Sequence, residues 1–374
     1  MHIIEVTTAQ LAKEFINLPA TIYKNDPDWI SPLHNDIEAV FNPQLNNFYN
    51  HGICCRWLLK DGDRCIGRIA AFINKEKAYS NPQPTGGIGF FECIENTEAA
   101  FLLLNTGRDW LKHHGMKAMD GPINFGENDK YWGLLVEGFK PPSMGMNYNP
   151  PYYQEIFEAY GFQKQYDQLT NLLDLHIPFT ERFTRIADWV MKKPGYRFEH
   201  LDIRRFEKYA ADFAEVYNDA WHGFEGFAPI QMETIRESFR QMKPIVDEKI
   251  IWFVYHNDEP IAFILCLPDI NQVLRHLNGK MNLWGKLKFL WYKKTTKIDR
   301  IRIIIMGCKK QYQNHGIESA IVRNLQLEVK KQPAIRFVEL AWVGDFNKKM
   351  LAIHEATGAQ KDKVHRTYRY IFPG

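Results

Sequence analysis

Apolar and polar positions along the chain fall into two hairpin patterns, one in each half. In the first half, apolar and aromatic runs at 54–59 and 65–73 flank a polar, glycine-containing stretch. In the second half, runs at 250–255 and 260–267 flank a stretch with asparagine and aspartate. Short turn-forming stretches between such runs are typical of antiparallel strand pairs. The pattern therefore predicts one β-hairpin in each half.

A strand and then a helix follow each hairpin. An apolar run at 89–93 precedes a helical pattern at 98–114, and a run at 303–308 precedes a helical pattern at 317–330. Four apolar residues in the later helix recur at four-residue intervals: Ile317, Ile321, Leu325 and Val329. Such spacing predicts one apolar helix face that packs on a sheet.

Each half closes with the same three elements. They are a strand, a short helix followed by a glycine, and a further strand, at 117–123, 152–160 and 167–175 and again at 337–343, 347–357 and 366–372. A glycine just past a helix is the usual left-handed cap. One element order that occurs twice indicates a duplicated domain.

The repeat sets the expected domain organisation. At 374 residues the chain is long for one core, so two domains are expected. We predict mixed α/β domains at 1–176 and 198–374, each with a mostly antiparallel mixed sheet flanked by helices. A linker at 177–197 carries prolines that interrupt a helical pattern. That the domains share or exchange a terminal strand is a further hypothesis.

Composition excludes several classes. With 45% hydrophobic and 24% charged residues, the chain is an ordinary globular protein, and its net charge of +3 does not favour a nucleic-acid partner. No apolar run approaches the ~20 residues of a membrane span, and the first residues lack a signal-peptide layout. We therefore expect a cytoplasmic protein.

The cysteines and paired histidines do not indicate a metal centre. Six cysteines are scattered without a CxxC pair. The neighbours His113 and His114, like Cys54 and Cys55, point apart on a helix or strand. We expect reduced cysteines and no metal.

The turn before residue 317 is a candidate anion site. Strand 303–308 leads through a polar, glycine-bearing turn into a helix. The free N–H groups of a helix's first turn point outward at its positive end, so they bind anions well.

This segment resembles the acyl-CoA-binding half of the GNAT superfamily of N-acetyltransferases. The phosphate loop of that family aligns with Gln313, Asn314, His315, Gly316 and Ile317, and Glu318 then replaces a small residue. A second motif aligns with Asn347, Met350, His354, Gly358 and Ala359, in which His354 takes the place of a tyrosine. The segments at 121–124 and 148–153 are similar to those of tandem GNAT proteins from bacteria.

The resemblance implies a cofactor site. Acetyl-CoA or another acyl-CoA would serve as co-substrate, with its pyrophosphate on the N–H groups from Gln313 to Ile317. Its pantetheine would pair with the strand at Met306 and Cys308, and His354 would protonate the thiolate. The alternative for His354 is a solvent-facing side chain on its helix. Asn347 is expected either to contact the cofactor or to cap its helix.

The acceptor of the transfer is expected to be a small-molecule or peptide amine. Transfer needs a base, and Glu339 and Glu225 are the candidates. Glu339 alternates with apolar residues on a strand, so it could equally face solvent. Glu225 lies in a glycine–aromatic loop where GNAT proteins build their acceptor site.

The first half keeps the fold pattern without the chemistry. Two carboxylates and no glycine precede its helix at residue 98, and Phe157 occupies the tyrosine position. We expect this domain to be degenerate for coenzyme A. Its distinctive part is a long insertion at 124–150, because connections of this length are often functional.

The segment 280–302 is basic and aromatic, and Asp299 is its one acid. It is expected either to pack its apolar side on the sheet, with lysines outside, or to bind an anionic membrane surface or an acidic partner.

The leading hypothesis is an acyl-CoA-dependent N-acyltransferase, most simply an acetyltransferase, that acts by direct transfer. One alternative is a non-catalytic binding protein with the GNAT fold. Another is an aminoacyl-tRNA-dependent transferase like those that build peptidoglycan bridges, which would bind RNA with a steep dependence on salt.

Overall fold

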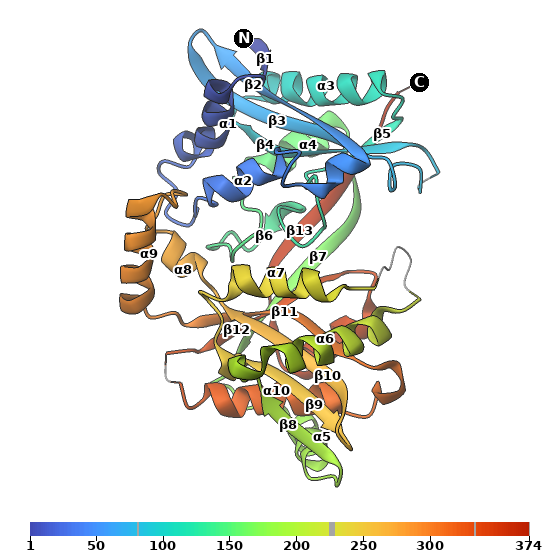
Figure 1. The fold of residues 1–374 in the computed structure, drawn as a ribbon. Coiled ribbons are helices and arrows are strands. Elements are labelled where there is room, and N and C mark those ends of the chain that lie inside the picture. The colour runs from blue at the N-terminus through green and yellow to red at the C-terminus, as the bar shows by residue number, and fades with distance from the viewer. Residues whose placement is uncertain (81, 224–228, 333, 374) are drawn as a thin grey trace.

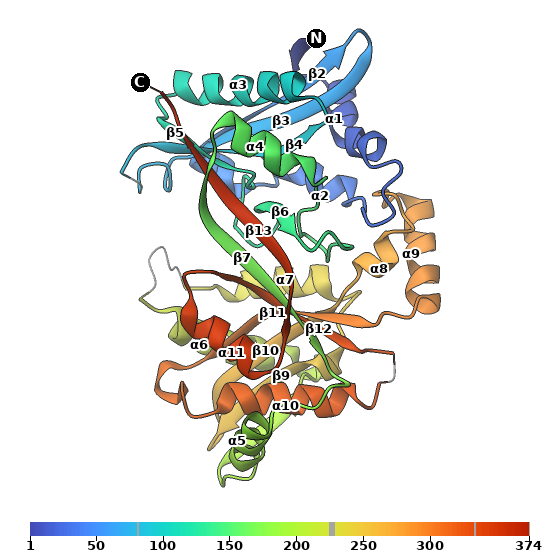
Figure 2. The ribbon, with the colours of Figure 1, turned by 180° about the vertical axis from the view of Figure 1, so that it is seen from behind.

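Two sheets with helices on both faces are joined into one in the computed structural model, which describes residues 1–80, 82–223, 229–332 and 334–373 (Figures 1 and 2). The first half contains β1 (His2–Glu5), α1 (Ala9–Ile22), α2 (His34–Val40), β2 (Gly52–Asp61), β3 (Arg64–Asn74), β4 (Thr85–Cys93), α3 (Thr97–His113), β5 (Ala118–Gly121), β6 (Leu134–Glu137), α4 (Tyr152–Tyr160) and β7 (Gln163–Asp174). The second half contains α5 (Glu181–Met191), β8 (Tyr196–His200), α6 (Phe206–Trp221), α7 (Met232–Met242), β9 (Ile251–His256), β10 (Glu259–Pro268), α8 (Asn271–Leu274), α9 (Leu283–Thr295), β11 (Arg300–Cys308), α10 (Ile317–Val329), β12 (Phe337–Gly344), α11 (Lys348–Ala356) and β13 (Gln360–Ile371).

The mixed α/β fold with a repeated element order is confirmed. The predicted hairpins are the antiparallel pairs β2–β3 and β9–β10. The predicted apolar stripe is the buried face of α10, and Gly161 ends α4 in the left-handed conformation with φ of 108°. Strand β5 ends at Gly121, earlier than expected, because the next residue is Pro122, which has no N–H for a sheet ladder.

The predicted linker contains regular structure. Helix α5 spans most of 177–197, and its Phe183 and Val190 belong to the same buried cluster as Ile317 and Ile321 of α10. Strand β8 then begins at Tyr196 and forms the edge of the sheet beside β9. This segment therefore packs as part of the second half.

The two halves exchange their final strands, which the sequence analysis had given as a hypothesis. Strand β7 of the first half pairs with β12 of the second, whereas β13 of the second half pairs with β5 and β6 of the first. Strands β7 and β13 also pair with each other, so that a single 13-stranded sheet runs through the molecule. The two strands cross the middle of the molecule side by side in both views (Figures 1 and 2).

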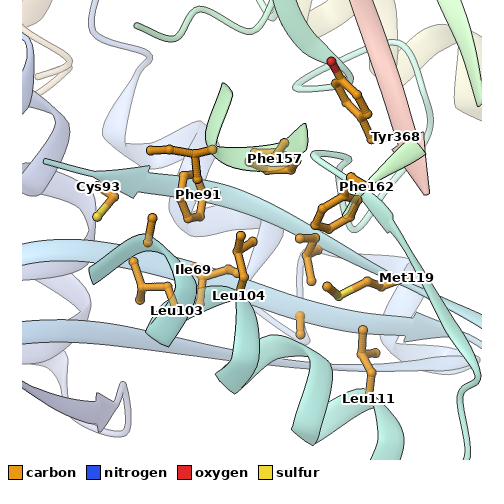
Figure 3. Close-up of a cluster of buried hydrophobic side chains, with 14 of the residues drawn as sticks. Ile69, Phe91, Cys93, Leu103, Leu104, Leu111, Met119, Phe157, Phe162 and Tyr368 are labelled. Atoms are coloured by element: carbon orange, nitrogen blue, oxygen red, sulfur yellow. The ribbon is translucent and has the colours of Figure 1, made fainter. Parts of the chain in front are cut away.

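The exchange makes each core depend on residues from the other half of the sequence. Tyr368 of β13 lies in the first-half core with Phe157 and Phe162 (Figure 3). Phe372, just after β13, belongs to the same buried cluster. Leu173 and Leu175, on and just after β7, lie in the second-half core beneath α10. Neither half buries its apolar surface completely without the other half's strand.

A Tyr368→Ala substitution is expected to destabilise the first half, although residue 368 belongs to the second half of the sequence. Tyr368 is 1% exposed, and truncation of a buried aromatic costs about 3 to 5 kcal/mol of unfolding free energy. Hydrogen exchange followed by mass spectrometry should report faster exchange in α3 and α4 than in α10. The matched variant Phe263→Ala, in the core under α6, should show the opposite distribution; equal patterns would contradict the exchange.

Candidate active site

Strands β11 and β12 separate in the middle of the second half. They pair in parallel only from Arg300 opposite Phe337 to Arg302 opposite Glu339, although β11 continues to Cys308 and β12 to Gly344. Beyond this short ladder, the described residues of the two strands record no further pairing with each other. A wedge-shaped gap therefore opens in the sheet, with Arg302 and Glu339 at its apex.

The corresponding gap in the first half is filled by backbone. Strands β4 and β5 pair from Thr85 to Gly87, and then the Ile123 N–H donates to the Ile88 carbonyl at 2.8 Å. A Cβ added to Gly89 would lie 1.9 Å from the Ile123 carbonyl oxygen. The chain itself thus occupies the space between these strands, and among the described residues the open gap is a feature of the second half alone.

The predicted anion loop joins β11 to α10 beside this gap. Asn314 and Gly316 have positive φ values of 65° and 80°, and Gly316 is the N-cap residue of a helix that starts at Ile317. Among the described residues, no side chain caps this N-terminus, so the first-turn N–H groups of α10 are available. The carboxylate of Glu318 lies in the same turn.

Gln313 stabilises the loop through its side chain. Its Nε2 donates to the Cys308 carbonyl at 3.1 Å, and its Oε1 accepts from Lys349 Nζ at 3.3 Å. Lys349 thereby brings a positive charge to the loop, and the sequence did not single it out. The two predicted strand residues both lie on β11, where Met306 pairs in register with Ile264 of β10. Cys308 is buried, and its burial raises the pKa of its thiol.

His354 is buried on α11, so the alternative of a solvent-facing histidine is wrong. Only 6% of the residue is exposed, and its Nδ1 accepts from Asn171 Nδ2 at 2.9 Å. Burial lowers the pKa of His354 to about 4, so the imidazole is neutral at pH 7 with its proton on Nε2. Asn347 caps the same helix, accepting from the Met350 N–H at 3.2 Å.

Acid is expected to destabilise the fold through His354 and His365. His365 on β13 is also buried, Nε2 contacts the Asn147 carbonyl at 2.9 Å, and burial lowers its pKa to about 4. Both histidines take up a proton near pH 6.5 only when the chain is unfolded. Their contribution to stability is therefore complete above that pH and is lost as the pH falls toward 4, at about 1.4 kcal/mol per pH unit for each.

Urea unfolding between pH 4.5 and 7.5 measures this contribution. The His354→Gln variant should show a shallower loss of stability in acid than the unmodified protein, because one of the two histidines is absent. Identical slopes for the two proteins would contradict burial as the cause.

Glu339 lies fully buried at the apex of the gap, so the solvent-facing alternative is wrong here too. Its Oε2 accepts from Ser143 Oγ at 2.6 Å, and its Oε1 lies 3.2 Å from Arg302 Nε. Arg302 also donates to the Met144 carbonyl at 2.8 Å. The other candidate base, Glu225, lies outside the described residues.

The insertion at 124–150 reaches across to this apex. Ser143 and Met144 contact Glu339 and Arg302, and Asn271 Nδ2 donates to the Pro142 carbonyl at 2.8 Å. These contacts could not be predicted from sequence, because no local pattern links residue 143 to residue 339. The first half thus supplies one wall of the site in the second.

A large apolar cavity opens from the gap under α6 and α7. It has a volume of about 490 Å³, within the range of small-molecule sites. Each surrounding element contributes side chains, among them Phe213, Ile235, Phe253, Leu265, Ile305 and Trp342. Its polar lining includes Arg302 at the apex, Asp129 and Lys130 from the insertion, Asp269 just after β10, and Ser238 and Gln241 on α7. The cavity suits a molecule with a long apolar body and a polar end.

Among the described residues, no group of histidine, cysteine, aspartate and glutamate side chains is arranged to hold a metal ion. Within those same residues, each helix is too short or too polar to cross a bilayer.

Two curated proteins align along nearly the whole chain, whereas no protein-family model matches it. The bacterial ceramide synthase of Caulobacter vibrioides is 30% identical over 381 residues, covering 98% of this chain and 97% of that protein. Protein YghO of Escherichia coli is 29% identical over 365 residues, covering 95% and 92%.

Solved structures share the fold at low sequence identity. A tandem GNAT protein from the clavulanic acid biosynthesis pathway superposes with a TM-score of 0.56 at 13% identity, covering 100% of this chain and 99% of that one. A GCN5-related N-acetyltransferase from Sphaerobacter thermophilus gives a TM-score of 0.53 at 11% identity, covering 100% and 96%.

Proposed function

Because this chain belongs to the family of the Caulobacter bacterial ceramide synthase and has a tandem GNAT fold, we propose that it transfers an acyl group from acyl-CoA to a long-chain amine. A ceramide is the amide of a fatty acid and a long-chain amino alcohol, so both reactants of such a synthase carry long apolar chains. The observation that carries the proposal is the apolar cavity of about 490 Å³ at the gap between β11 and β12.

The cavity supports an amphiphilic acceptor with a defined orientation. Ile304 and Ile305 of β11 and Ala341 and Trp342 of β12 line it on both sides of the gap. An aliphatic chain would lie under α6 and α7, where its burial is favourable by about 0.8 kcal/mol for each methylene. The amino group would then lie near Arg302 and the apex of the gap.

The loop before α10 supports the binding of acyl-CoA in the second half alone. The uncapped N–H groups that start at Ile317, the left-handed Gly316 and the nearby Lys349 suit a diphosphate, whereas Glu318 opposes it. We propose that Gln313, Asn314, His315 and Gly316 form this cradle and that Met306 and Cys308 on β11 face the pantetheine.

The reaction needs an uncharged amine and a route for one proton. The amine nitrogen attacks the thioester carbonyl, the carbon–sulfur bond breaks, and the nitrogen loses the proton that the departing thiolate finally takes up. Glu339 at the apex and Glu225 are the proposed bases, and His354 is the proposed donor to the thiolate. Because His354 is neutral, it must first take up the proton that the amine loses before it can pass one to the sulfur. Positioning of amine and thioester supplies most of the acceleration.

An assay with matched substrates tests the proposal. The purified protein is mixed with acyl-CoA of two, eight or sixteen carbons and with either a C18 amino alcohol or ethanolamine, and thiol release and amide mass are measured. We expect an amide from the long amine and none from ethanolamine. Absence of thiol release with every pair would overturn the proposed reaction.

A non-catalytic binding protein is the second candidate. The engagement of Glu339 by Ser143 and Arg302, and the neutral state of buried His354, favour it. Calorimetry with the same amphiphile would then show binding without any product. The aminoacyl-tRNA alternative stays a prediction.

A further inference from the structure

Helix α9 lies on one side of the molecule, level with the junction of the two halves (Figures 1 and 2). Large apolar side chains of this helix are exposed. They form what we term the α9 surface: Leu283, Trp284, Leu287, Leu290 and Trp291. Trp284 is 73% exposed and Trp291 is 59% exposed. Exposed large apolar residues are normal when scattered singly, but a contiguous set marks an interaction site.

The helix has two apolar faces with different surroundings. At 100° per residue, the five residues of the α9 surface fall within an arc of about 120°. On the opposite side Phe289 and Tyr292 pack against the cluster around Ile270 and Val273. Packing on the body of the protein is thus satisfied by the inner face, and the outer face remains uncovered.

Lysines flank the α9 surface on both sides. Residues 280–298 contain six lysines and no acidic residue: Lys280, Lys286, Lys288, Lys293, Lys294 and Lys297. Within the described part of the chain, none of them forms an ion pair with a carboxylate. By the same helical spacing, Lys286 and Lys293 lie on one flank of the arc and Lys288 on the other, whereas Lys294 lies within the arc at the C-terminal end of the helix.

We propose that the α9 surface seats the protein on an anionic lipid bilayer. Tryptophan and leucine side chains that insert between lysine-lined flanks are the composition of a helix lying in a membrane interface, where tryptophan rings prefer the headgroup level. Each lysine near an anionic surface adds attraction that salt weakens. A bilayer fits this chemistry better than a folded acidic partner, because both apolar and basic residues are spread along the full helix.

The inner side of α9 adjoins the cavity through shared residues. Met144, Ile245 and Ile270 belong to the cluster beneath α9 and also line the cavity. Helix α9 therefore stands between a bilayer bound at the α9 surface and the wall of the space proposed for a long-chain substrate. The membrane proposal does not depend on the reaction, since vesicle binding is measured without any substrate.

Vesicle flotation with the full-length chain tests the proposal. Vesicles of phosphatidylcholine with about one third phosphatidylglycerol should bind the protein, and pure phosphatidylcholine vesicles should bind it at least about tenfold more weakly, because the attraction of the lysines to anionic lipid is lost. The double variant Trp284→Glu with Trp291→Glu should lose binding to both kinds of vesicle.

Trp189→Glu is the matched control, because Trp189 is 60% exposed on α5 with Lys193 Nζ 3.5 Å from its ring centroid. This variant should bind anionic vesicles as the unmodified protein does. A second pair, Trp284→Phe with Trp291→Phe, should still bind but lose the quenching of tryptophan fluorescence by brominated lipid. Absence of vesicle binding, equal binding to neutral vesicles, or full binding by the glutamate variant would each overturn the proposal.

Discussion

Replacement of Ala210 by tryptophan is expected to abolish acylation of a long-chain amine while the fold stays intact. Ala210 is 2% exposed on α6, and its side chain lines the apolar cavity. An indole at this position would occupy the space of an aliphatic chain. Displacement of about four methylene groups would cost about 3 kcal/mol, so kcat/KM should fall more than about a hundredfold.

The neighbouring variant Ala211→Trp separates blockage of the cavity from damage to the helix. Ala211 is exposed on the same helix, so the same substitution there adds the indole to solvent. Ala211→Trp should leave kcat/KM within about twofold. Thermal unfolding should show that Ala210→Trp is at least as stable as Ala211→Trp. Unchanged turnover in a folded Ala210→Trp protein would contradict the assignment of the cavity to substrate.

Replacement of Arg302 by leucine is expected to lower the free energy of unfolding by about 3 to 5 kcal/mol, because it leaves a buried carboxylate without its counter-charge. The carboxylate is that of Glu339, whose side chain is fully buried 3.2 Å from Arg302 Nε. The variant also removes the hydrogen bond from Arg302 to the Met144 carbonyl. Urea unfolding at pH 7 measures the loss.

Two further variants identify the cause. Arg336 directly precedes β12 and forms an ion pair with Asp174 in which the arginine is 53% exposed. The variant Arg336→Leu should therefore lower the free energy of unfolding by less than about 1 kcal/mol. Addition of Glu339→Gln to Arg302→Leu should restore much of the stability, since the amide is uncharged and can still accept from Ser143. A double variant no more stable than Arg302→Leu would show that the arginine acts through packing instead.

Local patterns were sufficient to predict most elements of the fold. The turn residues between β2 and β3 and the four-residue spacing along α10 depend only on neighbours in sequence, and both structures are as expected. The partners of β7 and β13 could not be chosen in this way. Both strands follow a helix and read alike, and the pairing of Tyr368 with Gly121 joins residues from opposite halves of the chain.

The loop before α10 was predictable from the sequence, whereas the cavity under α6 and α7 was not. The polar turn and Gly316 carry a recognisable order of residue types, whereas Phe213 and Ile235 read as ordinary core positions, because the sequence does not distinguish a cavity wall from packed interior. Glu339 was a candidate base from the sequence, but its contacts with Ser143 and Arg302 form only in the folded molecule. Burial of His354 also lowers its pKa, and no sequence pattern indicates this shift.

Strand exchange also constrains how the protein can be made. A ribosome releases β5 long before β13 exists, so the edge of the first sheet that awaits β13 remains open through nearly all of translation. An unpaired strand edge is a template for aggregation, and completion through distant pairing is slow. The nascent first half is therefore exposed to aggregation until β13 is made. A chain that stalled just before residue 360 would leave β5 and β6 without β13, although β12 could still pair with β7.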